Sequence, residues 1–137
     1  MLKGFSHPDD ARRAIGAGAQ ALIVSNHGGR QLDSAIATLD ALPAVADAVN
    51  GEVPVLVDAG IRRGSDVLKA LALGADATLI GRPILWGLAV GGESGVSSVL
   101  ECVSSDLTRT MALCGLSSLS AIQRDVIRPQ SHGPAPI

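Results

Sequence analysis

The chain has 137 residues, enough for one domain with a core of its own. Its formal net charge is −2 at pH 7, which gives no electrostatic reason to expect nucleic acid or an anionic membrane as a partner. No apolar run reaches the roughly 18 residues that a membrane span needs. No signal peptide is visible either, so we expect a cytoplasmic protein.

Aromatic residues are nearly absent, with one Phe, one Trp and no Tyr. The core must therefore consist of Ala, Leu, Val and Ile, which is typical of a parallel sheet covered by helices. Cys102 and Cys114 fall in one predicted helix, roughly 18 Å apart at the helical rise, which is too far for a disulfide. We expect both to be small buried hydrophobes in a reducing compartment.

The first residues, Leu2-Lys3-Gly4, can be the end of a strand, or a disordered terminus with a solvated lysine. Ser6 is the predicted N-cap of a helix that Gly18 ends. An apolar strand then follows over residues 21–25.

A polar stretch, Ser25-Asn26-His27-Gly28-Gly29-Arg30-Gln31-Leu32-Asp33, follows this strand directly. It lies where α/β sheets and barrels place their chemistry, at the carboxyl end of a strand. His27 can accept a proton near neutral pH, and Arg30 can hold a carboxylate through two parallel hydrogen bonds. The residue types alone leave a second interpretation open, namely a polar loop whose histidine caps the next helix.

The next helix is predicted over about residues 35–50, where Pro43 could divide it in two. A buried strand over 53–58 ends at Asp58, and a turn of sequence Asp-Ala-Gly-Ile-Arg-Arg-Gly follows it. After another short helix, a strand over 77–80 leads into Gly81-Arg82-Pro83. Glycine and arginine between a strand and a helix favour an anion site, most often for phosphate.

Two segments repeat at an offset of 56 residues, 18–23 and 74–79. This spacing corresponds to two strand–helix units of about 28 residues each, the size of unit from which a (β/α)8 barrel is built. The sequence therefore predicts an α/β fold with parallel strands, part of such a barrel.

The remainder is predicted to be helical and to cover the barrel. A short helix from Trp86 to Val90 and a break at Gly91-Gly92 precede an amphipathic helix over 93–113. A serine-capped helix over 117–126 completes a domain of residues 1–127, and we expect residues 128–137 to form a disordered tail.

The nine residues from Ser25 to Asp33 resemble the active-site signature of the FMN-dependent α-hydroxy acid oxidases and dehydrogenases, the family of glycolate oxidase, lactate oxidase and mandelate dehydrogenase. This resemblance implies that His27 is the catalytic base and that Arg30 binds the substrate carboxylate. It also implies that Lys3 contacts the flavin ring, and that Ser25 faces the flavin.

The two glycine–arginine turns resemble those that hold the ribityl chain and phosphate of FMN in that family. The resemblance implies that Asp58 meets the ribityl chain. The residues implied around the phosphate are Ala59, Gly60, Ile61, Arg62, Gly81 and Arg82. Position 59 is often Gly in the family. Type 2 isopentenyl diphosphate isomerases and inosine monophosphate dehydrogenases have similar turns, so this pattern is less specific than the histidine stretch.

The resemblance covers only the C-terminal part of the family's barrel, since a whole barrel takes about 250 residues. It implies FMN as cofactor, a small α-hydroxy acid as substrate, and oxygen or another carrier as electron acceptor; no metal is expected. The alternative is an inactive half barrel that binds FMN or phosphate. Because a half barrel leaves strand edges open, we expect self-association or a complementing N-terminal half.

Overall fold

The computed structural model describes residues 1–128 as a parallel four-stranded sheet with helices packed against it. The strands are β1 (Leu2–Phe5), β2 (Leu22–Val24), β3 (Val55–Val57) and β4 (Ala77–Thr78), hydrogen-bonded in chain order. The helices are α1 (Pro8–Gly16), α2 (Thr38–Val49), α3 (Gly64–Ala72) and α4 (Arg82–Leu113). Short 3-10 helices are η1 (His27–Gly29), η2 (Leu119–Ala121) and η3 (Arg124–Val126).

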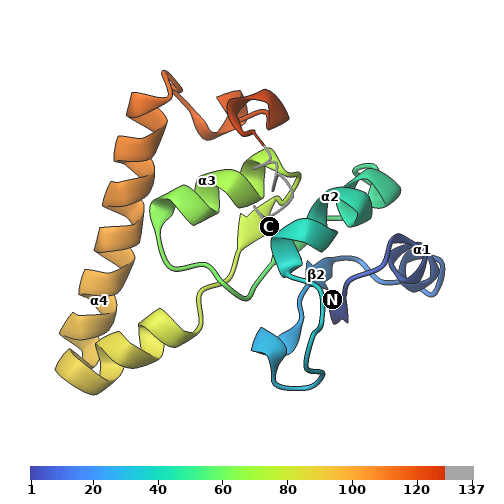
Figure 1. Ribbon diagram of the computed structural model, residues 1–137, viewed down its shortest axis with the longest axis horizontal. Coiled ribbons are helices and arrows are strands. Elements are labelled where there is room, and N and C mark those ends of the chain that lie inside the picture. Colours follow the sequence, from blue (N-terminus) through green and yellow to red (C-terminus); the bar gives the residue numbers. More distant parts are fainter. Residues whose placement is uncertain (129–137) are drawn as a thin grey trace, which may run out of the picture.

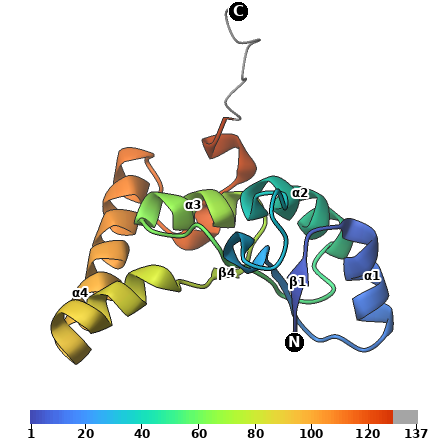
Figure 2. The same ribbon diagram turned by 60° about the horizontal axis from the view of Figure 1, so that its bottom comes forward.

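The helices follow one another across the molecule from α1 to α4, right to left in Figure 1. Figure 2 shows α1, α2 and α3 on one side of the strands. Parallel neighbours in chain order, each followed by a helix, are the arrangement of a (β/α)8 barrel segment. The Lys3 segment is therefore a strand and not a disordered terminus.

The core lies between the sheet and the first two helices. Its completely buried large side chains are Leu22, Val24, Leu42, Val45, Val49 and Val57. Each such side chain contributes about 1.5–3 kcal/mol through the apolar surface that it removes from water. A second, smaller cluster joins Leu68 and Ala72 of α3 to Ile122.

The internal repeat predicted from the sequence has identical backbone geometry in both copies. Gly18 and Gly74 follow α1 and α3 with φ of 93° and 105°. The next amides, of Ala19 and Ala75, donate to carbonyls five residues earlier at 2.9 and 3.0 Å. Both helices therefore end in a Schellman motif, and both glycines are required by their left-handed backbone.

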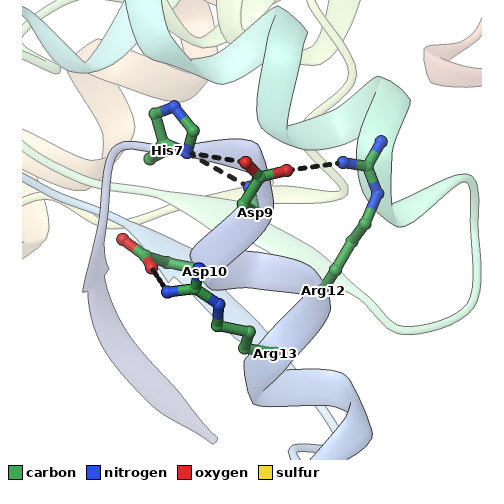
Figure 3. A network of polar contacts seen from close by, with 5 residues as sticks. All are labelled: His7, Asp9, Asp10, Arg12 and Arg13. Carbon is green, nitrogen blue, oxygen red and sulfur yellow. Dashed lines mark hydrogen bonds and ion pairs between the residues drawn. The ribbon is translucent and has the colours of Figure 1, made fainter.

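The first helix begins one residue later than predicted. His7, and not Ser6, is the N-cap, because its Nδ1 accepts a hydrogen bond from the amide of Asp9 at 3.3 Å and Pro8 occupies the first helical position. Figure 3 shows how Arg12 and Arg13 then reach back to Asp9 and Asp10, at 2.9 and 3.2 Å. These exposed pairs support the first turn of α1.

The helix predicted over 35–50 spans Thr38–Val49 and is continuous through Pro43, so the predicted division is wrong. Its buried face, which includes Leu42 and Val45, packs on both sides of the proline and holds the helix together across the lost backbone bond. The later start leaves residues 30–37 as a loop, in which Ser34 has a φ of 61°.

The break at Gly91-Gly92 is confirmed, since both residues have non-helical dihedral angles within α4. The two arms of α4 meet where Gly87 and Gly95 touch, backbone to backbone. The predicted helix over 117–126 is instead the pair η2 and η3, because the backbone is extended at Ile122, whose side chain is buried against α3. Residues 129–137 of the predicted tail lie outside the described residues.

The two cysteines are exposed, contrary to the prediction that they are buried. Cys102 lies in the second arm of α4 and Cys114 is its C-cap. This arm packs against α3, and the rest of its surface, which carries both thiols, faces solvent.

Candidate active site

A cavity of about 350 Å³ lies at the carboxyl ends of the four strands. Each strand, or the loop that follows it, contributes to its wall: β1 supplies Lys3, the loop after β2 supplies His27 and Arg30, and the β3 and β4 turns supply the rest. The structure thus brings together ten of the eleven residues predicted from the sequence: Lys3, His27, Arg30, Asp58, Ala59, Gly60, Ile61, Arg62, Gly81 and Arg82.

The eleventh predicted residue, Ser25, is buried and does not line the cavity. Its Oγ accepts a hydrogen bond from the amide of His27 at 3.1 Å. Ser25 therefore holds the backbone of His27 in place from the buried side of the loop. The cavity is also lined by Gly28, a glycine that lets the backbone come close to a ligand. Sequence reasoning missed four apolar lining residues, Leu79, Ile80, Pro83 and Leu85, whose side chains carry no chemical signal.

The backbone around His27 is tightly wound. His27, Gly28 and Gly29 have φ values of 55°, 69° and 75°, all left-handed. Asn26 holds this turn, because its Oδ1 accepts from the amide of Gly28 at 2.9 Å while its Nδ2 donates to the carbonyl of Ile36 at 3.2 Å. A left-handed histidine is uncommon and requires this kind of support.

Arg30 follows in the same loop, and its Nε donates to the carbonyl of His27 at 3.3 Å. This bond ties the guanidinium to the histidine turn without using its terminal nitrogens. The imidazole and a forked cationic group consequently border the same cavity, while both residues remain exposed.

Lys3 of β1 and Asp58, the residue after β3, form an ion pair across the strand that lies between them, β2. The pair uses Oδ2 of Asp58, whereas its Oδ1 is buried and has no hydrogen-bond partner among the described residues. A buried carboxylate oxygen without a donor is costly, so this atom is suited to accept a hydrogen bond from a ligand.

The turn after β3 is built around Ala59 and Gly60, both left-handed, with φ of 66° and 96°. Thr38 of α2 donates its hydroxyl to the carbonyl of Ala59 at 3.0 Å. The amides of Arg62 and Arg63 both donate to Oδ2 of Asp66 at 3.0 Å. These two amides are thus occupied, and the Arg62 side chain is the group that this turn offers to an anion.

Two further arginines, Arg62 and Arg82, line the cavity. The guanidinium carbon of Arg62 lies 5.8 Å from the centre of the Trp86 ring, within the range of a cation–π contact. Arg82 approaches the histidine loop, since a Cβ placed on Gly28 would lie 3.4 Å from its Nη2.

The cavity is cationic although the chain is acidic overall. Lys3, Arg30, Arg62 and Arg82 face it together with one carboxylate, Asp58, in a chain of net charge −2. This concentration of positive charge favours anionic ligands. Within residues 1–128, no group of three His, Cys, Asp or Glu side chains is placed to hold a metal ion, and no helix is long and apolar enough to cross a membrane.

The fold and the cavity together are those of a (β/α)8-barrel segment whose cationic cavity lies at the carboxyl ends of the strands. A family model described as FMN-dependent dehydrogenase matches residues 1–129. The chain belongs to this family, as its resemblance predicted.

Individual relatives support the same conclusion. The chain is 61% identical over 122 residues to an L-lactate oxidase of Nostoc sp., covering 89% of this chain and 33% of the relative. It is 50% identical over 128 residues to 2-hydroxyacid oxidase 1 of Homo sapiens, covering 93% and 35%. A solved mandelate oxidase with benzoyl-formic acid superposes with a TM-score of 0.86 at 49% identity, covering 90% of this chain and 37% of the other.

The likeness to mandelate oxidase confirms the predicted fold, part of a (β/α)8 barrel. The chain spans about a third of the length of the curated relatives that it matches.

Proposed function

We propose that this chain carries the cofactor and substrate groups of an enzyme that oxidises an α-hydroxy acid to an α-keto acid with FMN. The observation that carries the proposal is that His27 and Arg30 line the same cavity as the cationic turn at Arg62. A base and a carboxylate-binding arginine thereby face the place that suits a phosphorylated cofactor. The relatives named for oxidation of lactate, mandelate and 2-hydroxy acids support the same reaction class.

The residues of the cavity fit FMN. The unpartnered Oδ1 of Asp58 is suited to a hydroxyl of the ribityl chain. The guanidinium groups of Arg62 and Arg82 would hold the phosphate, aided by the turns at Ala59, Gly60, Ile61 and Gly81. Lys3 would lie beside the flavin ring, where its charge offsets the negative charge that develops on reduction. Ser25 would act through the backbone of His27, to which it is bonded.

Bound FMN would supply the acceptor for the two electrons that leave the substrate carbon. Arg30 would hold the substrate carboxylate by two parallel hydrogen bonds and so orient the reacting carbon. His27 would remove a proton from the substrate as general base. Oxygen or another carrier would then take the electrons from the enzyme.

The second candidate function is binding without turnover, in an inactive half barrel that holds FMN or phosphate. The observation that favours it is that His27 and Arg30 both remain exposed in the described part of the chain. In this case the cationic turns retain their ligand, but the site lacks the remaining wall that orients a substrate.

A flavin titration of the purified chain followed by anaerobic addition of lactate and mandelate tests both candidates. The enzyme proposal expects saturable FMN binding and bleaching of the oxidised flavin band, with bleaching abolished by His27→Ala. His7→Ala is the matched control, since His7 is exposed at the N-cap of α1 and outside the cavity, and it should bleach normally. Binding without bleaching supports the inactive half barrel. A folded chain that does not bind FMN contradicts the enzyme proposal, and a folded chain that binds neither FMN nor inorganic phosphate contradicts both.

We also propose that another half barrel completes the sheet. Strands β1 and β4 each have one neighbour in the described part of the chain, and Leu85, Leu88 and Val90 of α4 are exposed. Unpaired edges and apolar side chains favour association. Light scattering should show a mass above that of the monomer, or a one-to-one complex when the N-terminal part of a relative is added. A monomer in both measurements would contradict this.

A further inference from the structure

We propose that Gly4 is a positioning residue that sets the orientation of the His27 imidazole. This inference rests on the proposed function, in which His27 is the base. Gly4 lies in β1, directly beside the histidine that follows β2. A Cβ placed on Gly4 would lie 3.0 Å from Nε2 of His27 and 3.8 Å from its Cε1. The shorter distance is tighter than ordinary van der Waals contact, so the imidazole would have to give way by a few tenths of an ångström if position 4 carried a side chain.

The backbone of β1 is adapted to this contact. Lys3 pairs with Ile23 of β2, but Phe5 pairs with Val24, so one extra residue is accommodated at Gly4. Gly4 has a φ of 112°, which side-chain-bearing residues rarely adopt. Such bulges redirect neighbouring side chains and are frequent beside active sites. Here Lys3 is paired with Asp58, and Gly4 at the bulge places no side chain against the imidazole.

The histidine loop cannot simply move aside. The amide of His27 is bonded to Ser25 Oγ at 3.1 Å, and its carbonyl accepts from Arg30 Nε at 3.3 Å. With its backbone held at both ends, the ring is the part of His27 that must give way when a methyl group is added at position 4. Its displacement would move Nε2 from the position that it holds in the cavity.

A simpler explanation is that glycine is needed only for its backbone angle. Gly18 separates the two explanations, because its φ of 93° is similarly unfavourable for alanine and a Cβ there would meet nothing within 4 Å. Gly18→Ala is therefore matched to Gly4→Ala in backbone strain and differs from it in the contact with His27.

The test is the histidine ring spectrum of the whole chain by proton–nitrogen NMR, with the His27 signals assigned by their loss in His27→Gln. We expect Gly4→Ala to shift the His27 ring resonances, while Gly18→Ala leaves them at their wild-type positions. Unchanged His27 resonances in Gly4→Ala, or an equal shift in both variants, would overturn the proposal. No flavin or substrate is needed, so failure of the proposed enzyme activity would leave this result standing.

If Gly4→Ala is too unstable for NMR, a thermal double-mutant cycle distinguishes the contact with His27 from the effect of the backbone angle. His27→Ala removes the ring that the added methyl group meets. We expect the loss of Tm caused by Gly4→Ala to be smaller in the His27→Ala background than in the wild type, and the loss caused by Gly18→Ala to be the same in both. An identical loss for Gly4→Ala in both backgrounds would show that only the backbone angle matters.

Discussion

The guanidinium of Arg62 lies over the ring of Trp86, with 5.8 Å between the guanidinium carbon and the ring centre. Arg62 lines the cavity, and Trp86 lies in the first arm of α4 with about half of its surface exposed. The turn after β3 is thus joined to the helix after β4 by a contact that holds the arginine in place. Because this is the single tryptophan of the chain, its fluorescence reports directly on Arg62.

The first prediction uses this reporter. Inorganic phosphate should cause a saturable change in tryptophan fluorescence, because an anion that engages Arg62 alters the charge above the ring. Arg62→Ala should abolish the change. Arg63→Ala is the matched control, since the neighbouring arginine does not line the cavity. A titration with chloride at equal ionic strength corrects for screening. If Arg62→Ala and Arg63→Ala gave the same fluorescence response, phosphate would not bind at Arg62.

The second prediction separates the phosphate side of the cavity from the ribityl side. Arg82→Ala should weaken FMN binding about tenfold, the effect of roughly 1.4 kcal/mol from a lost charged hydrogen bond, and should leave riboflavin binding unchanged. Asp58→Ala should weaken both ligands, because riboflavin keeps the ribityl hydroxyls. Flavin fluorescence quenching measures both affinities. If Arg82→Ala weakened the binding of FMN and of riboflavin equally, Arg82 would not be the residue that binds the phosphate.

The third prediction concerns pH. Arg124 of η3 donates to both carboxylate oxygens of Asp47 in α2, at 3.2 and 2.8 Å. This hydrogen bonding, with the arginine's charge, lowers the pKa of Asp47. A lowered folded-state pKa gives stability that is present above the unfolded value of about 4 and is lost as pH falls through the folded value. Both side chains are half exposed or more, so screening limits the effect to about 0.5 kcal/mol.

Urea unfolding measures this contribution. Asp47→Asn should be less stable than the wild type at pH 7, and the difference should vanish as pH falls below about 4. Asp33→Asn, an exposed carboxylate with no ion pair among the described residues, is the control and should show no such trend. A difference between Asp47→Asn and the wild type that persists at pH 2 would mean that packing, and not charge, is responsible.

The sequence was enough to predict the order of strands and helices. It was also enough to predict that the residues after the strands lie close together in one site. Short apolar runs followed by polar turns identify parallel strands, and the carboxyl ends of such strands meet at one edge of the sheet. This is why residues as distant as His27, Asp58 and Arg82 could be placed in one site from the sequence, whereas Lys3 was assigned to it by the family resemblance alone. The repeated glycines at 18 and 74 helped, since each must follow a helix.

Contacts between side chains of distant elements could not be predicted. Nothing local marks Thr38 as the donor to the carbonyl of Ala59, or Arg124 as the partner of Asp47. The exposure of Cys102 depends on which face of α4 packs against α3, and helical periodicity alone left that face open. The contact between Gly4 and His27 depends on a one-residue shift in strand register, which leaves no trace in composition.

The last prediction contrasts the same substitution at two helix ends. Gly64 is buried at the start of α3, and a Cβ there would collide with the backbone of Leu107 in α4. Gly64→Ala should therefore force the two helices apart and destabilise the chain by about 1–3 kcal/mol. Gly16 lies at the exposed end of α1, with nothing within 4 Å of such a Cβ, so Gly16→Ala should raise stability by about 0.5 kcal/mol. Urea unfolding of both variants measures the difference in sign, and equal effects would mean that α4 does not pack on α3 in solution.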